Sequence, residues 1–456
     1  MHNGLDREHK AEIKADEKIK EYAHRLMTIA MDRGCDGAEV CVNESDEFSV
    51  GVLEDEVDDY TVSSSFGLGI RVQKDGRNGY AYTEAMDDPE GFVEEAIDNA
   101  ETVKSEDIHP MAEPAEYPEI PKKEDALKDM DESEKIELCK ALERETKRCD
   151  GRVKRVACCK VVTAGGRFCI YNTLGLRAER SDRVSCCYVE PVLEDKGQMR
   201  DGFAFRADGE ALDIAGCARE AVDEAIAAMD PAPVAPGRYD IILRNDAMAS
   251  ILGAFAGMFS ADAAQKGLSP LAGREGEDMA AECVTLMDDP LYPINPSPFD
   301  DEGTPSVAKA VIKDGKLETL LHNLKTARKA GVRSTGNASK YGYASPITVE
   351  PSNFYFKPGK RTLEEMMASI GEGLVITEMS GMHAGANPVS GDFSLLSKGY
   401  TIENGRKGRA VEQITVAGNF YTMLKNIREV GNDLEFFGSS YGSPSVDVGE
   451  MTVAGK

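Results

Sequence analysis

The stretch from Glu372 to Leu434 reads EGLVITEMSGMHAGANPVSGDFSLLSKGYTIENGRKGRAVEQITVAGNFYTMLKNIREVGNDL, and it decides how the rest of the chain is interpreted. Short apolar runs at 374–376, 400–402 and 414–416 are separated by glycine-containing segments. Because glycine lets the backbone turn tightly, this alternation predicts an antiparallel sheet. Small and polar side chains gather between the first two runs, at 382–394, which is typical of a loop that carries function.

Three short motifs within this stretch point to a family. Residues 381–394 have the pattern Gly-x-His-x-Gly-x-Asn-Pro-x-x-Gly-Asp-x-Ser, residues 402–405 are Ile-Glu-Asn-Gly, and residues 414–419 are Ile-x-x-Ala-Gly-Asn. Together they resemble the C-terminal signature of the TldD/PmbA family, and more closely its PmbA (TldE) branch. The resemblance implies a cytoplasmic subunit of a peptide-cleaving complex, linked to peptide maturation and degradation and historically called a modulator of DNA gyrase.

Length and charge limit the classes of protein that fit. The 456 residues exceed what one hydrophobic core usually supports, so two or three domains are expected. With 53 basic against 81 acidic residues, the formal net charge is -28, which repels the phosphate backbone of nucleic acids. We therefore expect no direct binding of nucleic acid, despite the historical name of the family.

Two further features favour a soluble cytoplasmic protein. The charged N-terminus lacks the apolar segment of a signal peptide, and the apolar run 247–259 is shorter than the ~20 residues of a membrane span. None of the 11 cysteines forms a C-x-x-C pair, so we expect reduced thiols buried as small apolar groups.

The order of patterns before residue 230 predicts a duplication. Helix, strands, hairpin and helix occur once in 1–105 and again in 131–230. The hairpin sequence Arg-Asn-Gly-Tyr-Ala-Tyr at 77–82 has the counterpart Arg-Asp-Gly-Phe-Ala-Phe at 200–205. Chance similarity of two hairpins is the alternative.

Two proline-rich breaks divide the chain. The segment 106–130 reads as a linker, and the run Pro-Ala-Pro-Val-Ala-Pro-Gly at 231–237 precedes a third domain, 237–456. The predicted fold is therefore α+β, with a duplicated helix-sheet-helix N-terminal region followed by a mainly antiparallel β-rich C-terminal domain.

The family resemblance also predicts what this chain lacks. It implies that members of the TldD branch carry His-Glu-x-x-x-His on a helix after the first strand of the C-terminal domain, where two imidazoles bind zinc and the Glu acts as general base. Aligned by eye, those positions hold Gly253, Ala254 and Met258, and the closest two of the six histidines are seven residues apart. We expect no catalytic residue and no metal cofactor in this chain, and a metal in a partner subunit.

His383 is the residue of the signature whose role has most alternatives. With Asp392 and Ser394 it offers the residue types of a hydrolytic triad, although no Gly-x-Ser-x-Gly elbow is present. With His322 and the acidic turn 300–302 it offers metal ligands. It also fits a substrate-facing or interface loop, or a structural histidine.

The cleft candidates are drawn from two stretches. The first supplies His383, Asn387, Asp392 and Ser394. The second, Arg-Ser-Thr-Gly-Asn-Ala at 333–338, resembles a Thr-Gly-Asn segment of the family and supplies Thr335 and Asn337. A capped loop, in which Ser, Thr and Asn side chains bond the backbone, explains the second stretch equally well.

Two functions follow. The first is a subunit that shapes the peptide-binding cleft of a metallopeptidase complex, with a TldD-like paralogue carrying the metal, or a homodimer. The second is a self-associating peptide-binding or scaffold protein without a catalytic partner. Neither function needs a membrane.

Overall fold

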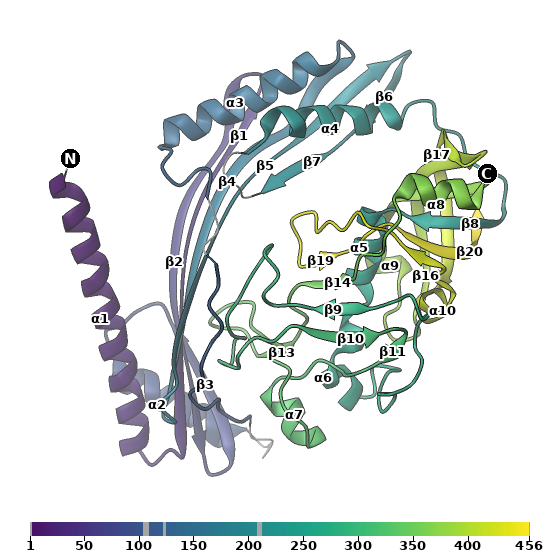
Figure 1. The fold of residues 1–456 in the computed structure, drawn as a ribbon. Helices are drawn as coiled ribbons and strands as arrows, with labels where there is room; N and C mark the ends of the chain where they lie inside the picture. Colours follow the sequence, from purple (N-terminus) through teal and green to yellow (C-terminus); the bar gives the residue numbers. More distant parts are fainter. Residues whose placement is uncertain (1, 104–108, 122–124, 208–211, 456) are drawn as a thin grey trace.

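The computed structural model describes residues 2–103, 109–121, 125–207 and 212–455, and the side chains of the first helix from Asp16 onward. These residues build helices and sheets in separate layers, which confirms the predicted α+β class (Figure 1). In this part of the chain, no helix is long and apolar enough to cross a membrane.

One antiparallel sheet of seven strands spans both predicted repeats, in the order β3-β2-β1-β4-β5-β6, with β7 also paired to β5. Two hairpins meet at its centre, where β1 pairs antiparallel with β4. The strands are β1 (Gly37–Leu53), β2 (Glu56–Lys74), β3 (Arg77–Thr83), β4 (Val153–Asn172), β5 (Arg177–Asp195), β6 (Gln198–Asp201) and β7 (Ala204–Ala207).

The apolar patterns at 38–42 and 48–53 predict two separate strands, whereas the structure has the single strand β1. The intervening Ser45, Asp46 and Glu47 are polar and exposed, and they interrupt the apolar pattern. The strand nevertheless continues, because β2 and β4 pair with β1 on both sides through these residues. Backbone pairing, rather than burial, holds this part of the sheet together.

Two pairs of helices cover one face of the sheet, one pair at each end. At the first end, α1 (His2–Asp32) and α2 (Pro89–Thr102) pack on Val40 and Val42. At the other end, α3 (Glu132–Cys149) and α4 (Ile214–Ala227) pack on Val50 and Val52. These β1 residues all have even numbers, so they share one face of the strand.

A glycine in each hairpin allows one helix of each pair to approach closely. A Cβ on Gly79 would stand 1.9 Å from the carbonyl oxygen of Ala96 in α2, and a Cβ on Gly202 would stand 2.0 Å from that of Ala221 in α4. Both glycines belong to the repeated sequence at 77–82 and 200–205. The two glycines thus make matching contacts, and the duplication stays a prediction.

The C-terminal domain contains a second sheet in the order β17-β16-β15-β8-β20-β18. Because β17 also pairs with β20, five of these strands close into a ring, and the pairing is antiparallel except between β8 and β15. The strands are β8 (Gly237–Leu243), β15 (Gly373–Ser380), β16 (Asp392–Glu403), β17 (Arg406–Asn419), β18 (Glu429–Val430) and β20 (Val446–Ala454).

A third sheet, in the order β11-β10-β9-β14-β19, packs on the same core. Its short strands are β9 (Leu286–Asp288), β10 (Lys309–Lys313), β11 (Lys316–Leu317), β14 (Phe354–Phe356) and β19 (Tyr441–Gly442); β12 (Ala338–Ser339) and β13 (Thr348–Val349) form a separate pair. The helices are α5 (Asn245–Phe255), α6 (Ala261–Gln265), α7 (Leu324–Ala330), α8 (Leu363–Ile370), α9 (Met382–Gly385) and α10 (Phe420–Asn426).

The segment 246–264 is rich in Ala, Met and Gly and predicts one helix, but that helix is broken in the structure. After α5 the chain forms a 3-10 turn, Ala256–Phe259, and then α6. Ser260 between them has extended backbone angles, and its hydroxyl accepts a hydrogen bond from the Ala263 amide as the N-cap of α6. The composition of this segment is helical, and the interruption follows from the cap.

The long N-terminal strands curve around the C-terminal domain, which lies on the face of the sheet opposite the helices (Figure 1). Phe299 of the C-terminal domain packs there on Phe168 of β4 and on Tyr117, with ring centroids 6.4 and 4.8 Å apart. Arg180 of β5 lies over the Phe299 ring and donates to its carbonyl oxygen at 2.7 Å. The two parts of the molecule therefore share a packed interface.

Candidate functional site

The signature loop lies at the surface between β15 and β16. It begins with α9, a single turn that carries His383 with an exposed side chain. Gly381, just before this turn, has a φ of 84°, a conformation that favours glycine. The tertiary fold thus presents His383 to solvent on a short turn of helix.

Asn387 and Asp392 fix the backbone of this loop. The Asn387 side-chain oxygen accepts hydrogen bonds from the amides of Val389 and Ser390, at 3.0 and 3.2 Å. The Asp392 carboxylate accepts one from the side chain of Asn419 at 2.8 Å, and this bond lowers the pKa of Asp392. Both side chains are exposed, so they are open to a ligand while they shape the loop.

The residue types of a triad do not form a bonded relay here. Ser394 lies on β16 opposite Ala417, with its side chain exposed. In the part of the chain that the structure describes, His383 makes no hydrogen bond with Asp392 or Ser394. The geometry supports an exposed polar loop better than a hydrolytic triad.

The second predicted stretch is tied into a buried polar cluster. Asn337 is buried and donates from its amide to Asp288 at 2.7 Å and to the Glu350 carbonyl at 3.1 Å. Thr335, half-buried, donates to the Asn337 side-chain oxygen at 2.7 Å and accepts from the His322 amide at 2.6 Å. These bonds are those of the capped loop, and whether the stretch also borders a cleft stays a prediction.

A group of charged residues that the sequence did not bring together lies at the interface of the two parts. Glu39 of β1 and Arg71 of β2 stand directly opposite each other in the sheet, both 3% exposed, with Nη2 and Oε2 3.0 Å apart. Arg71 also donates to the carbonyl oxygen of His109 at 3.0 Å. A carboxylate on one strand thereby neutralises a guanidinium that holds the linker.

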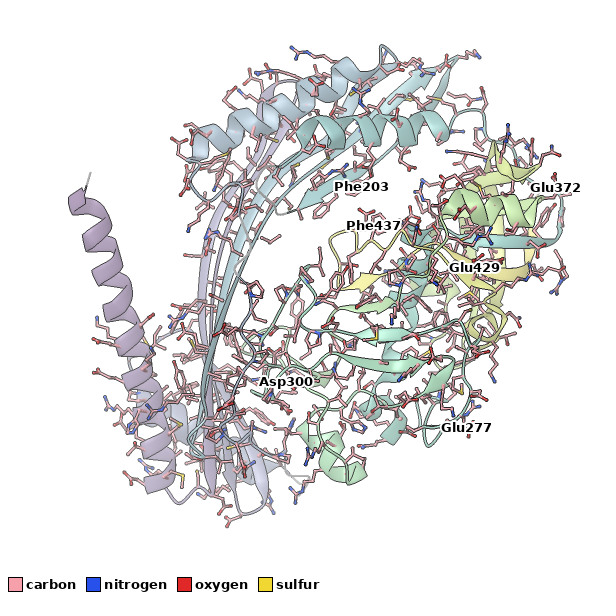
Figure 2. All side chains as sticks on the ribbon, viewed as in Figure 1. Phe203, Glu277, Asp300, Glu372, Glu429 and Phe437 are labelled. Carbon is pink, nitrogen blue, oxygen red and sulfur yellow. The ribbon has the colours of Figure 1, made fainter. Side chains whose placement is uncertain are left out.

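The C-terminal domain completes this group with its acidic turn, which Figure 2 shows beside the sheet at Asp300. Glu302 contacts the His109 ring through one carboxylate oxygen and accepts from the Leu324 amide at 2.8 Å through the other. Asp300 accepts from the amides of Thr304 and Ala338, at 2.9 and 3.0 Å. We call Glu39, Arg71, His109, Asp300 and Glu302 the interface cluster.

Burial decides which members of the interface cluster carry a proton. It raises the pKa of both Asp300 and Glu302, and it lowers the pKa of His109 to about 3, with Arg71 adding to that shift. Glu302 therefore holds its proton and His109 stays neutral near pH 7, so their contact is a hydrogen bond between neutral groups. The side chains are at most 7% exposed, which keeps a substrate away from them in this conformation.

The sequence pattern groups Asp300 to Glu302 with His322 and His383 as a possible metal site, but among the described residues the structure forms no group of three or more such side chains that could hold a metal ion. Glu302 meets His109 instead, a residue of the predicted linker to which no motif assigns a role. His322 is buried, which lowers its pKa, and its Nδ1 finds no partner among the described residues. The one signal of the cluster in the sequence is that Glu39 and Arg71 are charged residues within otherwise apolar strand segments.

Comparison with known proteins identifies the family. Residues 236–455 match the PmbA/TldA metallopeptidase C-terminal domain, residues 38–100 its domain 1 and residues 125–229 its central domain. The chain belongs to the PmbA/TldD family. The expected resemblance is therefore confirmed at the level of the family.

Relatives cover almost the whole chain. Metalloprotease PmbA of Escherichia coli O157:H7 is 26% identical over 473 residues, which cover 98% of each chain. A solved Thermotoga maritima structure, described as a modulator of a DNA gyrase, is 34% identical, covers 96% of this chain and 100% of that one, and has a TM-score of 0.88. TldE from Thermococcus kodakarensis, 24% identical over 95% of this chain and 100% of its own, shares the fold with a TM-score of 0.87.

Gly253, Ala254 and Met258, the positions at which the family resemblance places the metal motif, pack within the C-terminal domain. The Tyr441 ring lies 3.1 Å from where a Cβ on Gly253 would stand, and Met258 is buried in the core. Ala254 is packed against the same core. Within the described residues, no group of three or more His, Cys, Asp or Glu is arranged to hold a metal ion.

Proposed function

We propose that this chain is a subunit of a peptide-processing metallopeptidase complex, in which a TldD-like paralogue supplies the metal-binding helix. The observation that carries the proposal is the surface of α5: Gly253 receives the ring of Tyr441, and neither Ala254 nor the following Met258 offers a strong metal ligand. A chain with metallopeptidase-family domains but without these ligands fits a partner role better than independent catalysis.

The exposed signature loop is the part of this subunit that we assign to the peptide cleft. His383 offers an imidazole for hydrogen bonding, and Ser394 offers a hydroxyl on the neighbouring strand, both at the surface. The hydrogen bonds of Asn387 and Asp392 hold the loop in one shape, which lowers the entropy cost of binding a peptide. We place the complex in the cytoplasm and expect peptides, rather than nucleic acid, as its substrates.

Metal content and activity of the purified full-length chain test this proposal. Elemental analysis should find far less than one zinc per chain, and the chain alone should cleave no peptide. Addition of a purified TldD-like paralogue should give peptidase activity together with a complex on size-exclusion chromatography. About one zinc per chain that is lost in His383→Ala but kept in His24→Ala, an exposed histidine on α1, would overturn the proposal.

The same experiment distinguishes this function from the second one, a self-associating peptide-binding or scaffold protein. A stable homodimer that binds peptides, forms no complex with the paralogue and adds nothing to its activity would show a scaffold or binding protein instead. Activity of the complex that falls in His383→Ala, with complex formation unchanged, would support the assignment of the loop to the cleft.

A further inference from the structure

The edge of the N-terminal sheet is unpaired along one half of β2. Strand β3 pairs with Leu68–Lys74 only, and β1 occupies the other side of β2 along its whole length. Among the described residues no strand or bridge pairs with the outer side of Glu56–Gly67. Figure 1 shows β2 as the outer strand there, with α1 placed over the face of the sheet. Such an edge leaves backbone donors and acceptors free to pair with another strand.

The corresponding edge in the second repeat is occupied by other parts of the chain. On β5, residues 177–185 also lack a neighbouring strand, but the Ser185 hydroxyl donates to Asp125 of the linker. Arg183 pairs with the same Asp125 at 3.4 Å, and Arg180 pairs with Asp301 at 2.5 Å. On the β2 edge, Tyr60 donates to Glu132 of α3 at 2.6 Å, and Gly67 lies beside the ring of Tyr343. Neither contact involves the linker or the acidic turn, so different parts of the chain border the two edges.

The open edge is acidic and partly apolar. Residues 54–67 contain five carboxylates and no basic side chain. Asp55 and Asp59 are paired with Arg144 and Lys160, whereas Glu56 and Asp58 are exposed and form no ion pair within the described residues. Three apolar side chains on the same segment are also exposed: Val57 to 41%, Tyr60 to 44% and Val62 to 59%. A strand of another polypeptide that pairs with this edge would therefore contact both carboxylates and apolar side chains.

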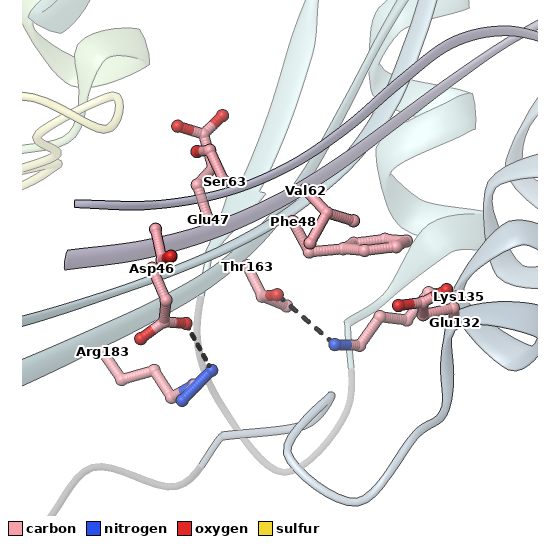
Figure 3. Close-up of a pocket in the computed structure, with 10 residues that line it drawn as sticks. Asp46, Glu47, Phe48, Val62, Ser63, Glu132, Lys135, Thr163 and Arg183 are labelled. Atoms are coloured by element: carbon pink, nitrogen blue, oxygen red, sulfur yellow. Dashed lines mark hydrogen bonds and ion pairs between the residues drawn. The ribbon is translucent and has the colours of Figure 1, made fainter.

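A pocket of about 330 Å³ opens beside this edge, on the face that carries the helices (Figure 3). Phe48 and Val62 give it apolar walls, and Lys135 donates to Thr163 within it at 3.3 Å. Side chains of an added strand alternate between the two faces of the sheet, so one residue of such a strand opposite Val62 to Ser64 would point toward the pocket.

We propose that the edge of β2, residues 56–66, binds an extended segment of a partner polypeptide that is rich in lysine or arginine and inserts an apolar side chain into the pocket. The added strand takes its affinity from backbone hydrogen bonds and its selectivity from charge and from the pocket. A second copy of this chain fits less well, because pairing through the same edge brings Glu56, Asp58 and Asp59 of both copies into one interface. The proposal does not depend on the metallopeptidase role.

A labelled peptide with alternating lysine and valine and one central phenylalanine tests this, by fluorescence anisotropy with the full-length chain. The peptide should bind, whereas a version methylated on alternate backbone nitrogens, which cannot donate along one edge, should not. Charge reversal in Glu56→Lys with Asp58→Lys should weaken binding about tenfold, since attraction to the basic peptide becomes repulsion at two exposed positions.

The matched control is Glu318→Lys with Glu364→Lys, which changes the net charge equally at exposed positions of the C-terminal domain. Equal weakening by the control pair, or equal binding of the methylated peptide, would show non-specific attraction to an acidic protein and overturn the proposal. Sedimentation of the chain alone tests whether the edge binds a second copy of this chain instead. Self-association that is stronger in the Glu56→Lys, Asp58→Lys variant would assign the edge to a second copy and overturn the proposal.

Discussion

The signature loop and the interface cluster are both polar, yet they are built in opposite ways. The loop draws its residues from one short stretch, 381–394, and lies at the surface, where water satisfies His383. The cluster draws its residues from β1, β2, the linker and the acidic turn, and buries them between two parts of the molecule. Residues that are close in sequence form an exposed surface that is open to a ligand. Residues that are far apart in sequence form a buried contact, in which removal of one group leaves its partner unpaired.

Removal of the buried cation should have the largest effect. Arg71→Ala leaves Glu39 charged and buried without its partner, and removes the donor to His109. We expect a loss of about 3–5 kcal/mol in the free energy of unfolding, measured by urea denaturation. Arg25→Ala, which breaks an exposed pair with Glu90, is the control and should cost less than about 1 kcal/mol. Equal effects would contradict the importance of burial.

The pH dependence of stability tests the protonation states within the cluster. Asp300 and Glu302 keep protons in the folded chain that they lose on unfolding. Their contribution to the free energy of unfolding therefore falls as pH rises from the ordinary carboxyl range to about 8. His109 acts in the opposite sense, because its contribution is lost as pH falls from 6.5 toward about 3. Between pH 6.5 and 8 the carboxyl groups dominate, and stability should decrease.

Glu302→Gln isolates one of these carboxyl groups. Glutamine keeps the size of the side chain and does not titrate, so the decrease in unfolding free energy between pH 6.5 and 8 should become shallower by up to about 1.4 kcal/mol per pH unit. Urea denaturation at several pH values measures the slope. An unchanged slope would mean that Glu302 is already ionised at the interface.

A steric change at the same interface should have an intermediate effect. A Cβ on Gly67 of β2 would stand 2.1 Å from the ring of Tyr343 in the C-terminal domain. Gly67→Ala should therefore displace that ring and cost about 1–3 kcal/mol in thermal or urea unfolding. Gly151→Ala, where a Cβ meets nothing within 4 Å, serves as the control. A cost no greater than that of the control would place Tyr343 elsewhere in solution.

The loop should tolerate substitution with the smallest effects on stability. Asn387→Ala removes two hydrogen bonds to exposed amides and should cost about 0.5 kcal/mol, while His383→Ala should change the unfolding free energy by less than about 0.5 kcal/mol. Hydrogen exchange of the Val389 and Ser390 amides should rise in Asn387→Ala alone. A large destabilisation by His383→Ala would give this side chain a structural role instead.

Local patterns were sufficient for much of the fold. The sequence predicts a helix at 363–370, and its bounds match those of α8, because helix signals lie within a few residues of each other. The pattern helix, strands, hairpin and helix, predicted twice before residue 230, matches the order of the elements along the chain. The spacing of the six histidines is sufficient by itself to rule out a local zinc motif on one helix.

Tertiary structure alone decided what lies between the elements. The continuity of β1 through 45–47 depends on pairing with two neighbouring strands, and no local pattern records that pairing. The contact between His109 and Glu302 joins residues nearly two hundred positions apart. Sequence periodicity reports which face of an element is apolar, and burial of a charge depends instead on which distant element covers it. The signature loop could be found from sequence because its residues are neighbours along the chain. The interface cluster could not, because its residues become neighbours only when the chain folds.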